Sequence, residues 1–210
     1  MGQLTIDSVV FDFGGVLIDW DPRHLYRKLM RDEAAIEGFL SRVCTTDWNH
    51  MQDEGRRWED AVEELSGRFP EHRSMIEAYW HRWPEMMLGP FDETVSIADD
   101  LRQRGVKLYG LTNFSAETFP FARARFEFLE WFEGIVVSGE VGSAKPSPRI
   151  FRLLLERFDL DPASLVFVDD QPRNVEAARS LGIQSHRFTT ATELRNHLTR
   201  LDLLDSRAAE

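Results

Sequence analysis

The sequence has a single cysteine, Cys44, among its 210 residues. One cysteine cannot form an internal disulfide and cannot supply a cysteine-rich zinc site. The six histidines show none of the close spacings of a zinc site or a catalytic triad. Disulfide scaffolds and zinc chemistry are therefore excluded, and we expect a reduced, cytoplasmic compartment.

Long hydrophobic runs and excess positive charge are also missing. No apolar stretch approaches the roughly 20 residues that span a bilayer, and residues 1–8 lack the basic and apolar segments of a signal peptide. Lys and Arg number 25 against 36 Asp and Glu, a net charge of −11. Such a balance disfavours a broad surface for nucleic acid or anionic lipid. We expect neither partner, and a monomer or homodimer that acts on a small molecule.

Short apolar runs rich in β-branched residues are present along the chain. Nearly continuous apolar character indicates strands buried on both faces, as in a parallel sheet between helices. The predicted strands cover Ser8–Phe13, Val106–Thr112, Gly134–Ser138, Leu165–Asp170 and, more weakly, Ile183–Phe188. Amphipathic helices are predicted between them over Asp92–Arg104, Pro148–Phe158 and Asn174–Leu181. This alternation predicts an α/β fold with a doubly wound, Rossmann-like parallel sheet.

The region from Asp21 to Leu88 interrupts this alternation. It has no clear strand pattern and carries Arg, Glu, Trp and Met at helical spacings. Five of the six tryptophans lie in or beside it: Trp20, Trp48, Trp58, Trp80 and Trp83. We predict a helical insertion (residues 21–88) between residues 1–20 and 89–210 of the core, and expect most of these aromatic residues to form its interior.

Polar residues stand at the ends of four predicted elements. In an open α/β sheet, ligands bind at the carboxyl ends of the strands. Each segment alone has an ordinary explanation: a turn for an aspartate before glycines, a helix cap for a threonine, a surface position for a lysine. The segments are Asp12-Phe13-Gly14-Gly15, Thr112-Asn113, Lys145 before Pro146, and Asp169-Asp170.

The adjacent acids Asp169 and Asp170 end a fully apolar strand. Like charges repel strongly in a low-dielectric environment. If the two side chains are buried, a cation or a lysine close by would remove this penalty.

Taken together, the four segments resemble the four motifs of the haloacid dehalogenase (HAD) superfamily. The resemblance runs from Val9 to about Phe188. The stretches beginning at Lys145 (KPSPRIF) and Val168 (VDDQPRNVEAARSLG) look most similar to the phosphatase domain of soluble epoxide hydrolases and to bacterial α-glucose-1-phosphate phosphatases. The helical insertion also lies where this branch carries its cap domain.

The resemblance implies a phosphatase with Asp12 as nucleophile, acting on a small phosphorylated metabolite through an aspartyl-phosphate. It implies Mg²⁺ bound by Asp12, the Gly14 carbonyl and Asp170, with Asp169 next to these ligands and supporting the metal site. The same resemblance assigns the phosphoryl oxygens to Thr112, Asn113, Lys145 and the backbone around Gly14.

One position departs from this pattern. Most phosphatases of the superfamily carry a second aspartate two residues after the nucleophile, where this chain has Gly14. A positioned acid–base group contributes roughly 10²–10⁴ in rate. We first expect a phosphatase that acts on a leaving group needing little protonation, such as an anomeric sugar phosphate, and that depends strongly on leaving-group basicity. One alternative is a metal-free 2-haloacid dehalogenase; Arg23 or Arg27 would correspond loosely to the key arginine of those enzymes. The other alternative is a catalytically weak binding or scaffold protein.

Substrate choice is expected to come from the helical insertion. The candidates for facing the core are Trp20, Arg23, Trp48 and His50, together with Asp53 and Arg56. An aromatic ring or a guanidinium could bind a sugar or a second anionic group, and His50 could replace the missing acid. For each of them, a place in the interior or on the surface of the insertion is an equally good interpretation.

Overall fold

Successive side chains of the first strand, β1 (Ser8–Phe11), enter two different hydrophobic clusters in the computed structural model, which describes residues 6–205. Val9 and Phe11 belong to one cluster and Val10 to the other. This division follows from the alternation of side chains along a strand. The strand is fully buried on both faces, as its continuous apolar character predicts.

Five parallel strands form the main sheet, in the order β5-β4-β1-β6-β7. The added strands are β4 (Lys107–Thr112), β5 (Gly134–Val137), β6 (Leu165–Asp169) and β7 (Gln184–Arg187). The predicted doubly wound α/β fold is therefore confirmed. Each strand is slightly shorter than predicted. The first stops at Phe11 because the carbonyl of Phe13 already accepts turn hydrogen bonds from the N–H groups of residues 16–18.

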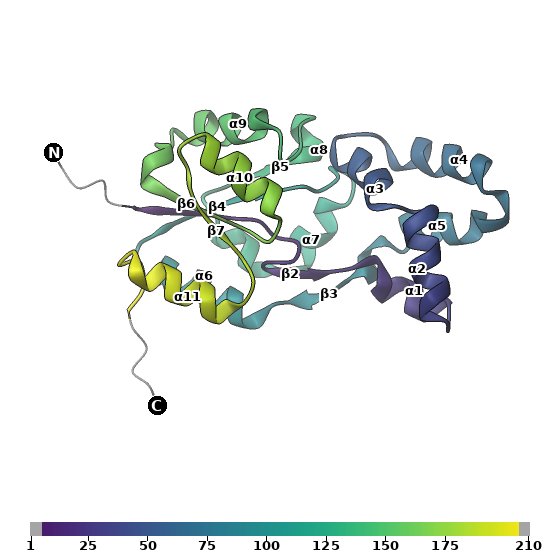
Figure 1. Ribbon diagram of the computed structural model, residues 1–210, viewed down its shortest axis with the longest axis horizontal. Helices are drawn as coiled ribbons and strands as arrows, with labels where there is room; N and C mark the ends of the chain where they lie inside the picture. The colour runs from purple at the N-terminus through teal and green to yellow at the C-terminus, as the bar shows by residue number, and fades with distance from the viewer. Residues whose placement is uncertain (1–5, 206–210) are drawn as a thin grey trace.

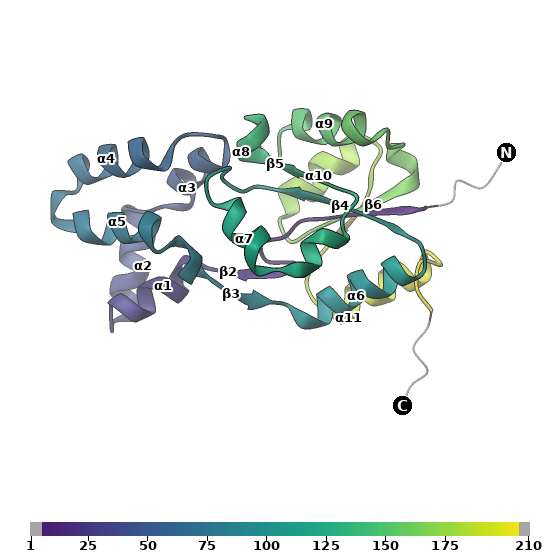
Figure 2. The ribbon, with the colours of Figure 1, turned by 180° about the vertical axis from the view of Figure 1, so that it is seen from behind.

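Helices cover both faces of this sheet (Figures 1 and 2). On one face lie α6 (Asp92–Gln103) and α11 (Ala191–Arg200), and on the other α9 (Pro148–Phe158) and α10 (Pro172–Ser180). The last begins two residues before its predicted start, because proline suits a first helical turn, where no N–H is needed. Short helices α7 (Phe119–Arg125) and α8 (Ser138–Val141) and the 3₁₀ turns Glu127–Trp131 and Pro162–Ser164 were not predicted.

The helical insertion contains five α-helices at the far end of the molecule from the sheet (Figure 1). These are α1 (Pro22–Leu29), α2 (Glu33–Arg42), α3 (Thr46–Asp53), α4 (Trp58–Arg68) and α5 (Arg73–His81), with 3₁₀ turns at Pro70–His72 and Trp83–Met86. Two antiparallel strands, β2 (Ile18–Trp20) and β3 (Met87–Pro90), carry the chain out and back. The sequence did not predict this pair, because runs of three and four residues are too short to show alternation.

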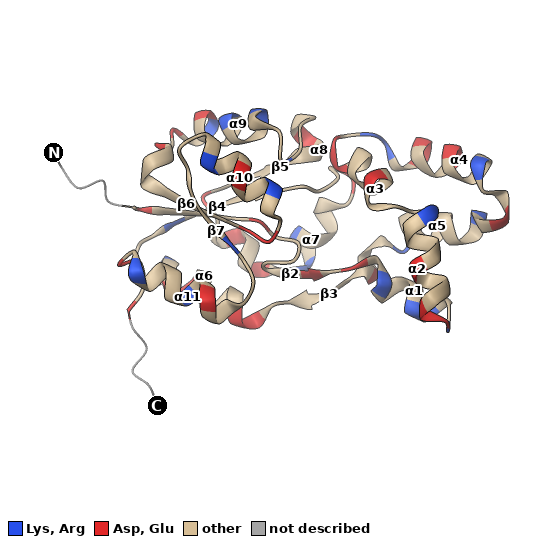
Figure 3. Ribbon diagram, in the orientation of Figure 1, with Lys and Arg blue, Asp and Glu red and all other residues tan. Residues whose placement is uncertain are grey.

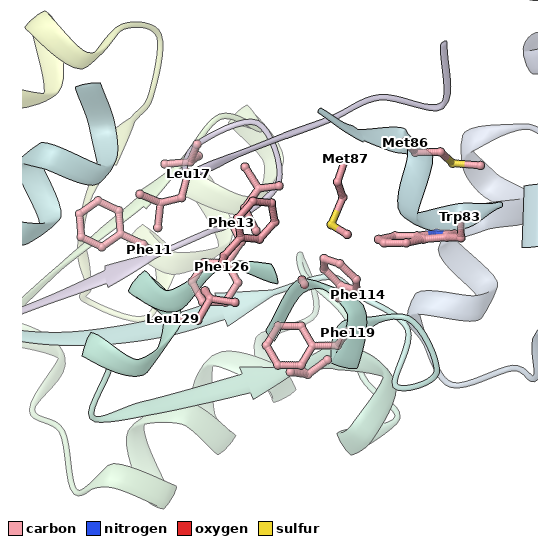
Figure 4. Packing of buried hydrophobic residues seen from close by; sticks show 14 of the residues in the cluster. Phe11, Phe13, Leu17, Trp83, Met86, Met87, Phe114, Phe119, Phe126 and Leu129 are labelled. Atoms are coloured by element: carbon pink, nitrogen blue, oxygen red, sulfur yellow. The ribbon is translucent and has the colours of Figure 1, made fainter. Parts of the chain in front are cut away.

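Aromatic packing holds the insertion together and joins it to the core. Trp58 stacks on Trp80 with 5.4 Å between ring centroids, and Trp48 meets Trp58 and Tyr79 edge to face. At the junction, Trp83 packs on Phe114 with centroids 5.0 Å apart. Figure 4 shows this contact continuing into the phenylalanines beneath the sheet.

Acidic and basic side chains are interspersed along the helices of both regions (Figure 3). Among residues 6–205, no helix is long and apolar enough to cross a membrane.

Candidate active site

The buried Lys145 links Asp12 of the first predicted segment to Asp169 of the fourth. Lys145 Nζ lies 2.8 Å from Asp12 Oδ2 and 2.7 Å from Asp169 Oδ2, and its side chain has no exposed surface. Asp12 directly follows β1, and its other oxygen accepts a hydrogen bond of 2.7 Å from the Phe13 N–H. The adjacency of β1 and β6 brings both carboxylates to one edge of the sheet, so Asp12 is held in a single orientation.

The electrostatics of this group are dominated by burial. Burial raises the pKa of Asp12; the Lys145 charge opposes the rise, and the Asp169 charge adds to it. Burial alone would lower the pKa of Lys145, but the two carboxylates raise it above its usual value. The lysine is therefore charged at neutral pH, and it stabilises the Asp12 carboxylate.

Asp169 is occupied by hydrogen bonds from within the chain. Besides Lys145, it accepts bonds from the Gln171 N–H at 2.8 Å and from Asn174 Nδ2 at 3.0 and 3.1 Å. These donors leave it little capacity to bind a ligand. Its geometry suits positioning of the lysine. Sequence reasoning missed the part played by Asn174, although the residue stands in the fourth motif, because its side-chain direction depends on where α10 begins.

A metal ion could bind at this edge, where three carboxylates lie close together. One oxygen each from Asp12, Asp169 and Asp170 lies within 4.8 Å of the others. Burial, and then the Asp169 charge, raises the pKa of Asp170. A single lysine faces three carboxylates, so a divalent cation would relieve the remaining repulsion, and oxygen ligands suit Mg²⁺.

The glycines after Asp12 have different roles. Gly15 has φ +74°, and a Cβ there would lie 3.2 Å from the Asp170 carboxylate, so position 15 requires glycine. Gly14 has no such constraint: a Cβ at this position would meet nothing within 4 Å.

The second motif, Thr112-Asn113, lies at the carboxyl end of β4. The Asn113 side chain is used within the protein: Nδ2 donates to the Lys145 carbonyl at 2.9 Å, and Oδ1 accepts from the Lys145 N–H at 2.8 Å. This pair of bonds fixes the lysine backbone across the gap between two loops. Thr112 ends β4 and is buried, below the residues that line the cavity.

A cavity of about 750 Å³ lies between this edge and the helical insertion. Of the core predictions, Asp12, Gly14, Asn113 and Asp170 line it. From the insertion and its junction, Trp20, Arg23, His50 and Asp53 line it, together with other polar residues, among them Asp21, Glu37, Ser41, Thr46 and Asn49. The wall is therefore rich in hydrogen-bonding groups.

Two candidates from the insertion are placed elsewhere, which corrects the prediction that they face the core. Trp48 is buried in the aromatic cluster against Trp58 and Tyr79. Arg56 forms an ion pair with Glu64 at 2.5 Å, and neither Trp48 nor Arg56 lines the cavity. Trp48 and His50 are two residues apart on α3, so they point in nearly opposite directions around the helix.

Comparisons with known proteins agree with this geometry. The chain is 27% identical to the sesquiterpene phosphatase astK of Aspergillus oryzae over 91% of this chain and 96% of that protein. It is 34% identical to the drimenol cyclase drtB of Aspergillus calidoustus over 93% of this chain but 36% of that protein. A crystal structure of the HAD family enzyme bt-2542 from Bacteroides thetaiotaomicron superposes with a TM-score of 0.70 at 24% identity, over 93% of this chain and 99% of that one, a likeness of fold.

The family model of haloacid dehalogenase-like hydrolases matches residues 6–182. This range contains all four motifs, including Asp12, Lys145, Asp169 and Asp170. The chain is a hydrolase and belongs to the haloacid dehalogenase-like family.

Proposed function

We propose that this hydrolase is a Mg²⁺-dependent phosphatase that acts on a small phosphorylated metabolite through an aspartyl-phosphate on Asp12. The observation that carries the proposal is the arrangement at the floor of the cavity. Asp12 is held by Lys145 at 2.8 Å, and two more carboxylates lie within 4.8 Å. The match to a phosphatase over nearly the whole length of both proteins supports it.

Each residue has a definite task in this proposal. A carboxylate oxygen of Asp12 attacks phosphorus in line, the bond to the leaving oxygen breaks, and water later hydrolyses the acyl phosphate. Lys145 neutralises charge on the transferring group, and Asp169 and Asn113 keep the lysine in place. Asp12, Asp170 and the Gly14 carbonyl would hold Mg²⁺, which, when bound, supplies Lewis-acid stabilisation of the phosphoryl charge. Thr112 and the backbone N–H groups of residues 14 and 113 complete the cradle.

The division of labour within the chain belongs to the same proposal. The helical insertion, residues 21–88, acts as a cap over the core, of which the structure describes residues 6–20 and 89–205. Its contribution is the polar wall of the cavity, which suits a hydrophilic substrate such as a sugar phosphate better than a purely apolar one.

The dehalogenase alternative receives less support. Arg27, one of the two arginines matched loosely to that family, is paired with Glu33 at 2.8 Å and does not line the cavity. Three clustered carboxylates are also an unfavourable arrangement for an enzyme that works without a metal.

A substrate panel tests the proposal. Phosphate release is measured from p-nitrophenyl phosphate and from a set of sugar and polyol phosphates, with Mg²⁺ or with EDTA, beside halide release from 2-chloropropionate. Metal-dependent phosphate release is expected. Metal-independent halide release would establish the dehalogenase instead, and inactivity toward every compound would favour a binding protein.

A further inference from the structure

An open space lies where a second aspartate would project from position 14. No atom comes within 4 Å of a Cβ built on Gly14. A recess of about 50 Å³ adjoins this space, and it is lined by Gly14, Asn113 and Asp53 and closed by Trp20, Trp83 and Phe114. This volume has room for a water-sized group. One carboxyl group lines the recess, and it comes from the helical insertion.

Asp53 is held in this place by a chain of hydrogen bonds. Asn49 Nδ2 donates to Asp53 Oδ2 at 2.9 Å, and Tyr79 Oη donates to Asn49 Oδ1 at 3.0 Å. Asn49 and Tyr79 are buried. The orientation of the carboxyl is therefore set by the interior of the insertion, from α3 and α5 together.

The turn after Asp53 docks on the core. Gly55 has φ +104°, and a Cβ there would lie 3.3 Å from the Gly139 carbonyl oxygen. The Trp58 N–H donates to Glu117 of the core at 2.9 Å. These contacts keep the end of α3 close to the loop that follows β4, so Asp53 reaches the site without a large movement of the insertion.

The surroundings of Asp53 favour its protonated form. Burial raises its pKa to about 8, a backbone hydrogen bond from Ser115 opposes the rise, and the Asp12 charge adds to it. Asn49 lowers the pKa and Glu54 raises it by smaller amounts. A carboxyl group with this pKa is mostly neutral at pH 7 and can donate a proton.

We propose, resting on the phosphatase function above, that Asp53 is the general acid and base of the reaction and takes the place of the aspartate missing at Gly14. As Asp12 attacks phosphorus and the phosphorus–oxygen bond to the leaving group breaks, the Asp53 carboxyl gives its proton to the leaving oxygen. The Asp53 carboxylate then takes a proton from the water that attacks the aspartyl-phosphate. That step releases phosphate, restores the Asp12 carboxylate and leaves Asp53 protonated.

His50 is the competing donor in the same wall, because it also lines the larger cavity. Its Nε2 lies 3.8 Å from Glu54, and it does not line the recess beside Gly14. The geometry therefore favours Asp53.

The decisive measurement is the slope of log kcat/KM against leaving-group pKa, with Mg²⁺ present, over a series of aryl and alkyl phosphates. Gly14 alone predicts a steep slope, whereas a working Asp53 predicts a shallow one. Asp53→Asn is expected to lower kcat/KM for alkyl phosphates by roughly 10²–10⁴ and for p-nitrophenyl phosphate by less than about tenfold, so the slope steepens. Asp47→Asn, the same change at an exposed position of α3, should leave the slope shallow.

The wild type gives a second readout that does not depend on how well the variant folds. At alkaline pH, where Asp53 loses its proton, alkyl phosphates should slow while aryl phosphates continue. The charges of Asp12 and Glu54 raise the pKa of Asp53, and the Asp53 charge in turn raises the pKa of Tyr79. Asp53→Asn should abolish this difference between the two substrate classes.

Three results would overturn the assignment. A steep slope in the wild type means that no general acid operates. A shallow slope retained in Asp53→Asn means that another group donates the proton, and His50→Gln is then the next variant to measure. Wild-type inactivity toward the whole series would remove the phosphatase function and this assignment together. Either of the first two results leaves the phosphatase function standing.

Discussion

The carboxyl edge of the sheet and the wall provided by the helical insertion contribute to one cavity in different ways. At the edge, Lys145 and Asp169 are fully buried and are bonded to each other and to Asp12. In the insertion, the charged side chains that line the cavity are mostly paired locally, as Arg23 is with Glu37. The nucleophile and its lysine are therefore fixed at the edge of the sheet, while the insertion, apart from the proposed acid Asp53, can vary its wall without disturbing them.

The largest effect on activity is expected at Asp12. Asp12→Asn removes the nucleophile but keeps the size of the side chain, and it relieves repulsion with the neighbouring acids. We expect turnover to fall by at least about a thousandfold, since covalent catalysis is lost, with no loss of melting temperature. Phosphate release and thermal unfolding, measured on the same samples, check both parts.

A control variant separates the loss of a negative charge from the loss of the nucleophile. Glu156→Gln removes one carboxylate from an exposed position on α9 and should leave turnover unchanged. An Asp12→Asn protein that keeps more than a few per cent of wild-type activity would show that Asp12 is not the nucleophile.

The next largest effect is expected in the insertion and concerns stability. Trp48 is buried against Trp58 and Tyr79, so Trp48→Ala should cost about 3–5 kcal/mol of unfolding free energy. Because the ring does not line the cavity, KM for the folded fraction should change little. Urea unfolding measures the free energy of unfolding, and steady-state kinetics measure KM. A stable variant with a selectively raised KM would instead place Trp48 at the substrate.

The extent of what sequence can predict also differs between the two regions. Asp12 and Asp169 could be predicted to lie together because parallel strands bring their carboxyl ends to one edge. Lys145, in the loop before α9, could be added to them only through the resemblance of the four segments to the family's motifs. The task of Asn113 could not be predicted, since its partner is a peptide group 32 residues away. The sequence predicted a helical insertion but not which face of α3 lines the cavity, since Trp48 turns to the interior while His50 and Asp53 line the cavity.

Loss of a metal ligand is expected to have a smaller effect. If Asp170 is a ligand, Mg²⁺ should raise the melting temperature of the wild type, because a hundredfold excess over Kd adds about 2.7 kcal/mol to the free energy of unfolding. Asp170→Ala should lose most of that shift, and its metal-free form should be at least as stable as the wild type, because a repelling charge is gone. Differential scanning fluorimetry with and without Mg²⁺ measures this, with Glu156→Ala as the control. An undiminished shift in Asp170→Ala would exclude the ligand.

The smallest expected effect compares two arginines within the insertion. Arg23 and Arg56 each form an ion pair with a glutamate of the insertion at 2.5 Å, but only Arg23 lines the cavity. Ion pairs near the surface contribute about 0–1 kcal/mol, so Arg23→Gln and Arg56→Gln should both unfold within that margin of the wild type. Their kinetics should separate them. An interaction made equally in the ground state and the transition state changes KM and leaves kcat unaltered. We therefore expect Arg23→Gln to raise KM by a few-fold for substrates that carry a second anionic group, with kcat unchanged, and Arg56→Gln to alter neither. A fall in kcat for Arg23→Gln would mean that the wall of the insertion takes part in the chemical step through more than Asp53, and the separation between a reacting edge and a selecting wall would then fail.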